Sequence, residues 1–154
     1  MAPPYCYPYP RPAVTVDLVV FAPDGPSRRV LLIRRKHDPF AGKLALPGGF
    51  LDMDERAMDG ARRELREETG LDHPGPIAFV GYYDDPGRDP RGRTIGLAFA
   101  AVLDGPPPAV AGADDAAEAL WLTLEAAVAA DFAFDHAKIL ADALAWLDRR
   151  SAGG

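Results

Sequence analysis

One segment constrains the fold and the chemistry of this chain more than any other. Residues 44–50 (LALPGGF) form an apolar run that a proline and two glycines interrupt, and DERAMDGARRELREETG follows over residues 54–70. The second stretch has helical periodicity and predicts a helix over residues 54–69, ended by Gly70 just past the last turn. One face of this helix is apolar, and we expect it to pack on a sheet: Met58, Ala61 and Leu65.

Three carboxylates lie close together on a neighbouring face of the predicted helix. Glu64, Glu67 and Glu68 are spaced i, i+3 and i+4, where like charges repel by on the order of 0.3 kcal/mol per exposed pair. They also lie near the helix C-terminus, where the helix dipole disfavours anions. A hard divalent cation would explain the cluster, and oxygen-only ligands favour Mg²⁺ or Mn²⁺ over Zn²⁺. The alternative is a solvated face on which Glu and Arg are mixed for solubility.

The glycine-rich turn before the helix favours the metal interpretation. Pro47, Gly48 and Gly49 let the backbone approach a ligand closely, because glycine has no Cβ. A glycine turn that leads into an acidic helix suits a cradle for a phosphate group and a metal ion. We therefore treat the acidic face as a candidate metal site.

Composition places this segment in one acidic domain. The chain has 154 residues, of which 48% are apolar, and its 23 acids against 17 lysines and arginines give a formal net charge of −6. These values predict a single domain over residues 1–154, with residues 1–11 as an N-terminal arm and residues 151–154 as a frayed tail. The acidic balance argues against a nucleic-acid partner. It is compatible with an anionic small molecule as the ligand, provided that a metal cation lies between the ligand and the protein.

Cysteine content and hydropathy indicate the compartment. The single cysteine, Cys6, excludes an intramolecular disulfide and favours a reducing environment. The N-terminus lacks the positive region and apolar run of a signal peptide. Apolar stretches also fall far short of the roughly 20 residues that a membrane helix needs. We therefore expect a cytoplasmic protein with no membrane partner.

The rest of the chain predicts a sheet flanked by helices. Apolar and β-branched runs indicate strands over residues 13–21, 30–33, 77–83, 94–103 and 119–122. An amphipathic helix is expected over residues 134–149. Strands interrupted by two substantial helices predict a mixed α/β domain with a helix on each side of the sheet.

The acidic helix and its glycine turn together resemble a known family motif. The Nudix box, G-x5-E-x7-R-E-U-x-E-E-x-G-U with U aliphatic, is matched at all nine constrained positions by Gly49-x5-Glu55-x7-Arg63-Glu64-Leu65-x-Glu67-Glu68-x-Gly70-Leu71. Residues 12–50 also look like the first strands and the L-P-G-G-F loop of that family. The chain is identified by this resemblance as a member of the Nudix family. The resemblance implies the Nudix fold, a mixed β-sheet sandwiched between helices.

The resemblance implies a role for each box residue. The metal ligands would be the three clustered glutamates and one backbone carbonyl: Glu64, Glu67, Glu68 and Gly48. Arg63 and Glu55 would orient these carboxylates. The implied reaction is attack of a metal-activated water on a nucleoside diphosphate linked to another group. The identity of the general base stays open. It is either a box glutamate or one of three acids on a later loop, Asp114, Asp115 and Glu118, of which Asp115 is our candidate. These three acids could instead form a polar turn.

A second, polar loop indicates the substrate. Residues 82–92 (YYDDPGRDPRG) resemble the Y-S-D-P-G-R-D-P-R-G stretch of ADP-ribose pyrophosphatases, with Pro86 placed 15 residues after Leu71. The resemblance implies hydrolysis of ADP-ribose to AMP and ribose 5-phosphate. Three positions depart from the pattern: Asp84 replaces Ser, Arg93 replaces His and Leu44 replaces Trp.

Five side chains are candidate contacts to this substrate. Arg88 and Arg91 could hold a pyrophosphate or a ribose, or they could belong to a rigid surface turn with Asp–Arg pairs. Arg35 could meet a phosphate or remain solvated at its strand end. Tyr83 could stack on adenine. His136 lies on the apolar stripe of the last helix, either lining the site or as a core histidine.

Two other functions stay open. The same chemistry would serve a house-cleaning hydrolase of nucleoside triphosphates, including oxidised ones. Alternatively, the domain senses an ADP-ribose-type ligand without cleaving it, as Nudix modules of transcription regulators do. Such regulators add a DNA-binding winged helix, which we do not expect in a chain that ends at Gly154. Many relatives are homodimers, and the N-terminal arm could cross to a second copy.

Overall fold

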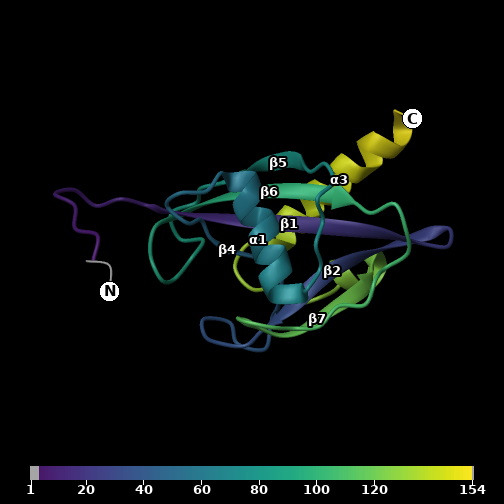
Figure 1. The fold of residues 1–154 in the computed structure, drawn as a ribbon, viewed down its shortest axis with the longest axis horizontal. Helices are drawn as coiled ribbons and strands as arrows, with labels where there is room; N and C mark the ends of the chain where they lie inside the picture. The colour runs from purple at the N-terminus through teal and green to yellow at the C-terminus, as the bar shows by residue number, and fades with distance from the viewer. Residues whose placement is uncertain (1–3, 154) are drawn as a thin grey trace.

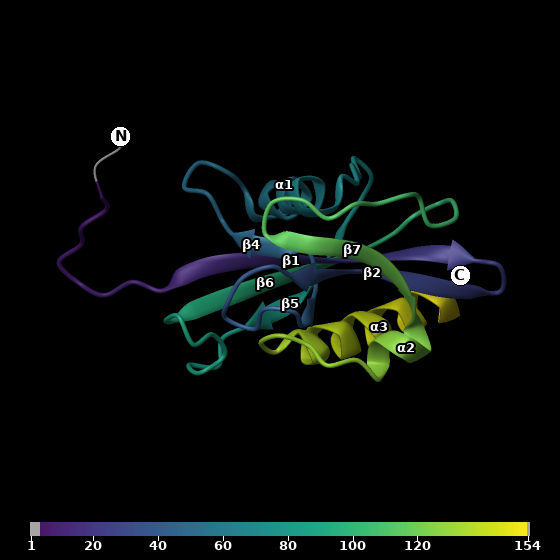
Figure 2. The same ribbon diagram turned by 90° about the horizontal axis from the view of Figure 1, so that it is seen from below.

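The chain folds as a mixed β-sheet between two layers of helix (Figure 1). The computed structural model describes residues 4–153. Its elements in chain order are β1 (Ala13–Asp24), β2 (Ser27–Arg35), β3 (Leu44–Ala45), β4 (Gly48–Phe50), α1 (Ala57–Thr69), β5 (Ala78–Tyr83), β6 (Thr94–Val102), β7 (Ala116–Thr123), α2 (Leu124–Val128) and α3 (His136–Ala152). Figure 2 shows α1 on one face of the sheet and α2 with α3 on the other. This arrangement confirms the predicted fold class.

The β1 strand organises the sheet because it pairs with three other strands. Hydrogen bonds connect the strands in the order β3-β2-β1-β6-β5, with β4 added to β1 and β7 added to β2. One edge of β1 runs parallel to β6 from Ala13 to Phe21. Its other edge pairs with β4 over residues 15–17 and with β2 from Phe21 onward. The candidate site lies at the β4 end, where this change of partner occurs.

Side chains of β1 alternate between two cores. The even-numbered Val16 and Val20 belong to the core that packs against α1, whereas the odd-numbered Val19 and Phe21 belong to the core that packs against α3. This is the period of two that a strand imposes on its side chains. Asp17 shares the odd-numbered face, and it therefore points toward the α3 layer.

The acidic helix starts later than predicted. α1 begins at Ala57 because the preceding segment forms its own turn, in which the Asp52 N–H donates to Glu55 Oε1 at 2.9 Å. It ends as expected, with Gly70 in the left-handed conformation at φ +76°. The expectation that Met58 packs on the sheet is wrong, because this residue is 40% exposed.

Two further differences concern the C-terminal third. The sequence did not predict α2, which Thr123 caps by accepting a hydrogen bond from the Ala126 N–H at 3.1 Å. The last helix starts at His136 and continues to Ala152, so the first residues of the predicted frayed tail are helical. Gly154 lies outside the described residues.

The segment before β1 stands apart from the sheet. Residues 4–12 have no regular secondary structure and project from the body of the domain (Figures 1 and 2). Residues 1–3 of the predicted arm lie outside the described residues. Within the part of the chain that the structure describes, no helix has both the length and the apolarity needed to cross a membrane.

Candidate active site

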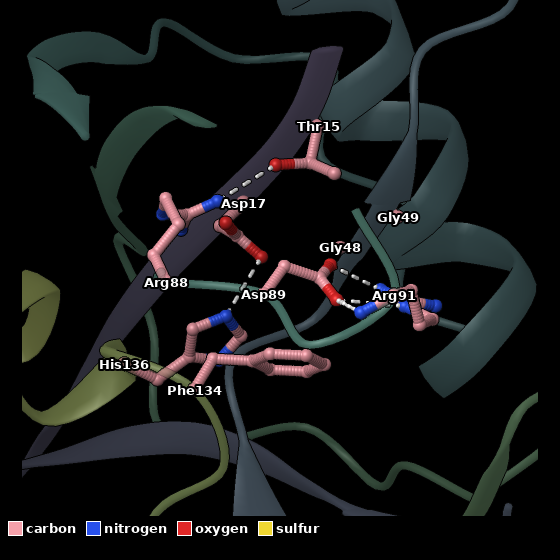
Figure 3. Close-up of a pocket in the computed structure, with 9 residues that line it drawn as sticks. All are labelled: Thr15, Asp17, Gly48, Gly49, Arg88, Asp89, Arg91, Phe134 and His136. Carbon is pink, nitrogen blue, oxygen red and sulfur yellow. Dashed lines mark hydrogen bonds and ion pairs between the residues drawn. The ribbon is translucent and has the colours of Figure 1, made fainter. Parts of the chain in front are cut away.

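A small cavity opens where β4 pairs with β1, and Figure 3 shows the side chains around it. Its volume is about 40 Å³. Four predicted site residues line it: Gly48, Arg88, Arg91 and His136. Sequence reasoning missed four further lining residues: Thr15, Asp17, Asp89 and Phe134.

Arg63 gathers the carboxylates of the acidic helix. Its guanidinium donates to the two oxygens of Glu55 at 2.7 and 2.9 Å. Its Nη1 atom lies 3.0 Å from both Glu64 Oε1 and Glu67 Oε2. The hydrogen bond from Arg63 is the main reason that the pKa of Glu55 lies below its ordinary value. The structure therefore brings these four box residues together.

Glu68 lies buried at the end of the acidic face, with 2% of its surface exposed. Its Oε1 accepts a hydrogen bond from the Gly48 N–H at 3.2 Å, whereas its buried Oε2 has no hydrogen-bond partner among residues 4–153. Burial raises the pKa of Glu68, and the neighbouring carboxylate of Glu64 raises it further. Burial also raises the pKa of Glu64. A bound cation would stabilise two neighbouring carboxylates in such a place.

The two glycines of the turn are required by close contacts. A Cβ on Gly49 would lie 2.5 Å from Glu64 Oε1, and a Cβ on Gly48 would overlap Asp17 Oδ1. The turn is therefore in contact with Glu64 of the acidic helix on one face of the sheet and with Asp17 of the cavity floor on the other. Any larger residue at either position would separate the two.

The donor set around Glu68 fits a hard divalent cation. In the described part of the chain, no three Asp, Glu, His or Cys side chains stand together in a ligating arrangement. Arg63 engages one oxygen of Glu64 and one of Glu67. The unpartnered Glu68 Oε2 remains, and carboxylate oxygens are the ligands that Mg²⁺ prefers. The Gly48 N–H donates to Glu68. That the Gly48 carbonyl binds the metal stays a prediction.

The floor of the cavity is polar and buried. Asp17 is 4% exposed and His136 is 6% exposed. His136 Nδ1 accepts a hydrogen bond from the Leu46 N–H at 3.0 Å, so Nε2 carries the ring hydrogen, and it lies 3.6 Å from Asp17 Oδ1. Burial lowers the pKa of His136 to about 4 and raises the pKa of Asp17 to about 7. A lone charge within the apolar run VTVDLVVF was the available signal for Asp17.

Arg88 is held within the protein. Its side chain is 4% exposed and forms two hydrogen bonds to the Asp135 carboxylate, at 2.8 and 2.9 Å. Its Nη1 also donates to the Thr94 hydroxyl at 3.2 Å. Arg88 is therefore held in a buried pair with Asp135, outside the loop, and does not belong to a surface turn, although one side of it lines the cavity.

Arg35 and Arg91 approach the same aromatic ring. Their guanidinium carbons lie 4.9 and 5.3 Å from the centre of the Phe134 ring. Arg91 is 40% exposed and pairs with Asp89 at 2.8 Å. Burial, followed by the nearby charge of Arg91, lowers the pKa of Arg35. Two cations beside the cavity favour an anionic ligand.

Tyr83 and Asp115 belong neither to the cavity lining nor to the acidic cluster. Tyr83 is 5% exposed in the core that packs against α3, so the expectation that its ring stacks on adenine is wrong. Asp115 is exposed just before β7, and its carbonyl accepts a hydrogen bond from the Lys36 N–H at 3.1 Å. Its role as general base stays a prediction.

Tyr83→Phe is expected to lower stability without affecting catalysis. The Tyr83 hydroxyl donates to Asp142 Oδ2 at 2.7 Å, and a hydrogen bond of this kind contributes about 1 kcal/mol. Thermal melting should show a lower Tm, whereas kcat/KM should stay within about twofold of the original value. A large fall in kcat/KM at unchanged Tm would restore the nucleotide-contact interpretation.

Gly60→Ala is expected to destabilise the domain by roughly 1 kcal/mol, although alanine is the better helix former by about that amount. A Cβ at position 60 would lie 2.7 Å from Glu55 Oε1 and 2.8 Å from Leu51 Cδ1. Glu55 is held by Arg63 and has little freedom to move away. Urea unfolding measures the change, and a more stable variant would contradict this account.

Comparison with known proteins agrees with this geometry. The NUDIX domain family model matches residues 11–143, which is most of the chain. The chain belongs to the Nudix family. The glutamates, the arginine and the glycine turn described above are thus its Nudix box, and the resemblance seen in the sequence is confirmed.

Relatives of this Nudix domain include an enzyme and a regulator. The ADP-ribose pyrophosphatase of Methanocaldococcus jannaschii is 40% identical over 138 residues, which cover 90% of this chain and 76% of the relative. The ADPR responsive transcriptional repressor NtrR of Acinetobacter baylyi is 35% identical over 147 residues, which cover 93% of this chain but only 57% of the repressor. The Nudix domain is common to both.

Solved structures of the family share this fold. The NUDIX domain of Shewanella oneidensis NrtR, complexed with ADP ribose, matches with a TM-score of 0.82 and 28% identity, covering 90% of each chain. A bifunctional NMN adenylyltransferase/ADP ribose pyrophosphatase of Francisella tularensis, complexed with AMP and a manganese ion, matches with a TM-score of 0.77 and 32% identity. That match covers 90% of this chain and 42% of the bifunctional one.

Proposed function

We propose that this Nudix domain hydrolyses the pyrophosphate bond of ADP-ribose, giving AMP and ribose 5-phosphate, with Mg²⁺ as its cofactor. The observation that carries the proposal is the buried Glu68 carboxylate, whose Oε2 has no partner in residues 4–153. An unsatisfied buried polar atom costs about 1–3 kcal/mol, which a purely structural helix would have no reason to retain. The relative named ADP-ribose pyrophosphatase and the NUDIX domain solved with ADP ribose support the choice of substrate.

Glu64, Glu67 and Glu68 would hold the metal. A bound Mg²⁺ supplies a Lewis acid that polarises pyrophosphate oxygens and lowers the pKa of water. The chain's own residues prepare the site, because Arg63 keeps Glu64 and Glu67 on one side and the Gly48 N–H holds Glu68 Oε1. Mn²⁺ should substitute for Mg²⁺, since it accepts the same oxygen ligands.

Arg35 and Arg91 would bind the diphosphate. Both guanidinium groups lie near Phe134, beside the cavity. Arg91 pairs with the buried Asp89, but its own side chain is 40% exposed, whereas that of Arg88 is 4% exposed. Their charges would offset the negative charge that the acidic helix and the substrate bring together. Arg88 would instead position the loop that carries Arg91.

A substrate panel with metal removal tests this proposal. Initial rates would be measured with ADP-ribose, NADH, nucleoside triphosphates and 8-oxo-dGTP, each in Mg²⁺ and in EDTA. We expect the highest kcat/KM for ADP-ribose, with activity lost in EDTA and restored by added Mg²⁺ or Mn²⁺. A wide preference for triphosphates would overturn the choice of substrate and favour a house-cleaning hydrolase.

A second candidate function is ADP-ribose sensing without hydrolysis. It is favoured by the 35% identity to a repressor whose name describes it as ADPR responsive. Saturable binding of ADP-ribose in Mg²⁺, with no AMP released, would support it. The net charge of −6 favours a small-molecule partner over a nucleic acid for this domain. The projecting arm makes a homodimer the assembly to test by light scattering.

A further inference from the structure

The cavity floor holds a buried carboxylate that hydrolysis of a pyrophosphate does not require. Asp17 is 4% exposed, and Figure 3 shows its carboxylate pointing into the cavity toward His136. In the described part of the chain, the carboxylate accepts no hydrogen bond, and its contact to His136 Nε2 is long, at 3.6 Å. A buried carboxyl group is costly unless it is hydrogen-bonded. The Asp17 carboxylate can therefore accept a hydrogen bond from a bound ligand.

The groups around Asp17 present both donors and acceptors. His136 is fixed by the Leu46 N–H, which accounts for Nδ1 and turns the Nε2 hydrogen toward the cavity. The Thr15 hydroxyl accepts from Arg88 Nη1 at 3.5 Å, so its own hydrogen is free to donate. A hydroxyl group suits this mixture because it donates and accepts at once.

Charge excludes the other common ligand groups from the floor. A phosphate on the floor would meet the carboxylate of Asp17, and a metal cation would meet the guanidinium of Arg88. Size excludes the nucleobase. About 40 Å³ is a few times the roughly 10–15 Å³ that one water requires, so the floor admits two or three hydroxyl-sized groups and no purine.

We propose that Asp17 and His136 bind the vicinal hydroxyls of a ribose, with Asp17 accepting a hydrogen bond from one hydroxyl and His136 Nε2 donating to its neighbour. This inference rests on the proposed function, because ADP-ribose has such a diol on its adenosine ribose and another on its terminal ribose. The chemistry of the two diols is the same, and the experiment distinguishes them. Asp17 thereby makes the site specific for ribose over deoxyribose.

The test compares three substrates: ADP-ribose, its analogue lacking the 2-hydroxyl of the adenosine ribose, and its analogue lacking the 2-hydroxyl of the terminal ribose. We expect kcat/KM to fall by roughly 10- to 100-fold for one analogue, since a site built to hydrogen-bond a hydroxyl rejects the compound without it. The analogue that is rejected identifies which ribose occupies the floor.

Variants at position 17 assign the discrimination to its carboxylate. Asp17→Ala should process ADP-ribose and the rejected analogue at nearly equal kcat/KM, with a Tm that is not lowered because a buried polar group is removed. Asp17→Asn keeps an acceptor oxygen and should retain part of the discrimination. The control is Asp148→Ala on the exposed face of α3, which should leave the ratio unchanged.

Two results would overturn the proposal. One is a wild-type protein with the same kcat/KM for all three substrates. This result can be interpreted without any variant. The other is a folded Asp17→Ala protein that still discriminates as the wild type does. The ribose site can be tested even if the proposed function fails. If ADP-ribose is not hydrolysed, calorimetric Kd values for the same three compounds show whether the ribose hydroxyls are bound. A preference for the intact diol that Asp17→Ala abolishes would support the ribose site, and equal or absent binding would overturn it.

Discussion

Glu68→Gln is expected to reduce kcat for ADP-ribose by about 100-fold or more while leaving the fold no less stable. Glutamine has nearly the same shape, so its oxygen can accept the hydrogen bond from the Gly48 N–H. The change removes one negative charge from the residues that would hold the metal, and metal affinity depends on the number of anionic ligands. The buried charge next to Glu64 is also removed, which should leave Tm unchanged or raise it.

The measurement pairs kcat with thermal melting in the presence and absence of Mg²⁺. We expect Mg²⁺ to raise the Tm of the wild-type protein, because a ligand that binds only the native state stabilises it, and to have little effect on Glu68→Gln. Glu125→Gln, on the exposed first turn of α2, is the matched control and should behave as wild type. Wild-type kcat in the Glu68→Gln protein would show that the acidic face is not the metal site.

Arg88→Met is expected to cost about 3 kcal/mol of stability, since breaking a buried pair leaves its partner charge uncompensated. The side chains of Arg88 and Asp135 are 4% and 20% exposed, and the pair joins the loop between β5 and β6 to the start of α3. Methionine fills similar volume but provides no donor for Asp135 or Thr94. For a domain of this size the loss corresponds to a fall in Tm of roughly 6–12 °C.

A double-mutant cycle with Asp135→Asn separates the pair from the rest of the loop. Because Asp135→Asn removes the partner charge, adding Arg88→Met should then cost less than it does alone. Arg88→Lys should recover part of the Tm, as it restores the charge without the two-pronged geometry. A wild-type Tm in Arg88→Met, combined with a raised KM, would mean that Arg88 acts on the substrate alone.

The acidic cluster and the helices α1 and α3 could be predicted because local chemistry determines them. Gly70 ends α1 by adopting a positive φ that other residues avoid, and the spacing of Glu64, Glu67 and Glu68 follows from helix geometry alone. The pattern of β1 also predicts a strand buried on both faces, as observed.

Other positions depended on tertiary contacts that periodicity does not contain. Met58 falls on the apolar stripe of α1, yet it is 40% exposed. Tyr83 follows the strand period into the core, where Asp142, distant in sequence, accepts its hydroxyl hydrogen. Asp17 is placed in the cavity only by the pairing of β1 with β4 and by the arrival of His136 from the last helix.

The position of the glycine turn has a consequence for how such a domain can diversify. The carboxylates proposed to hold the metal belong to the α1 layer. Arg88, Arg91 and His136 belong to the polar loop and the α3 layer on the other side of the sheet. The two layers meet at Gly48 and Gly49. Substitutions in the loop or in α3 can therefore alter which nucleotide is accepted while bond cleavage is preserved. Substitutions that change the substrate and substitutions that abolish activity should thus lie on opposite faces of the sheet.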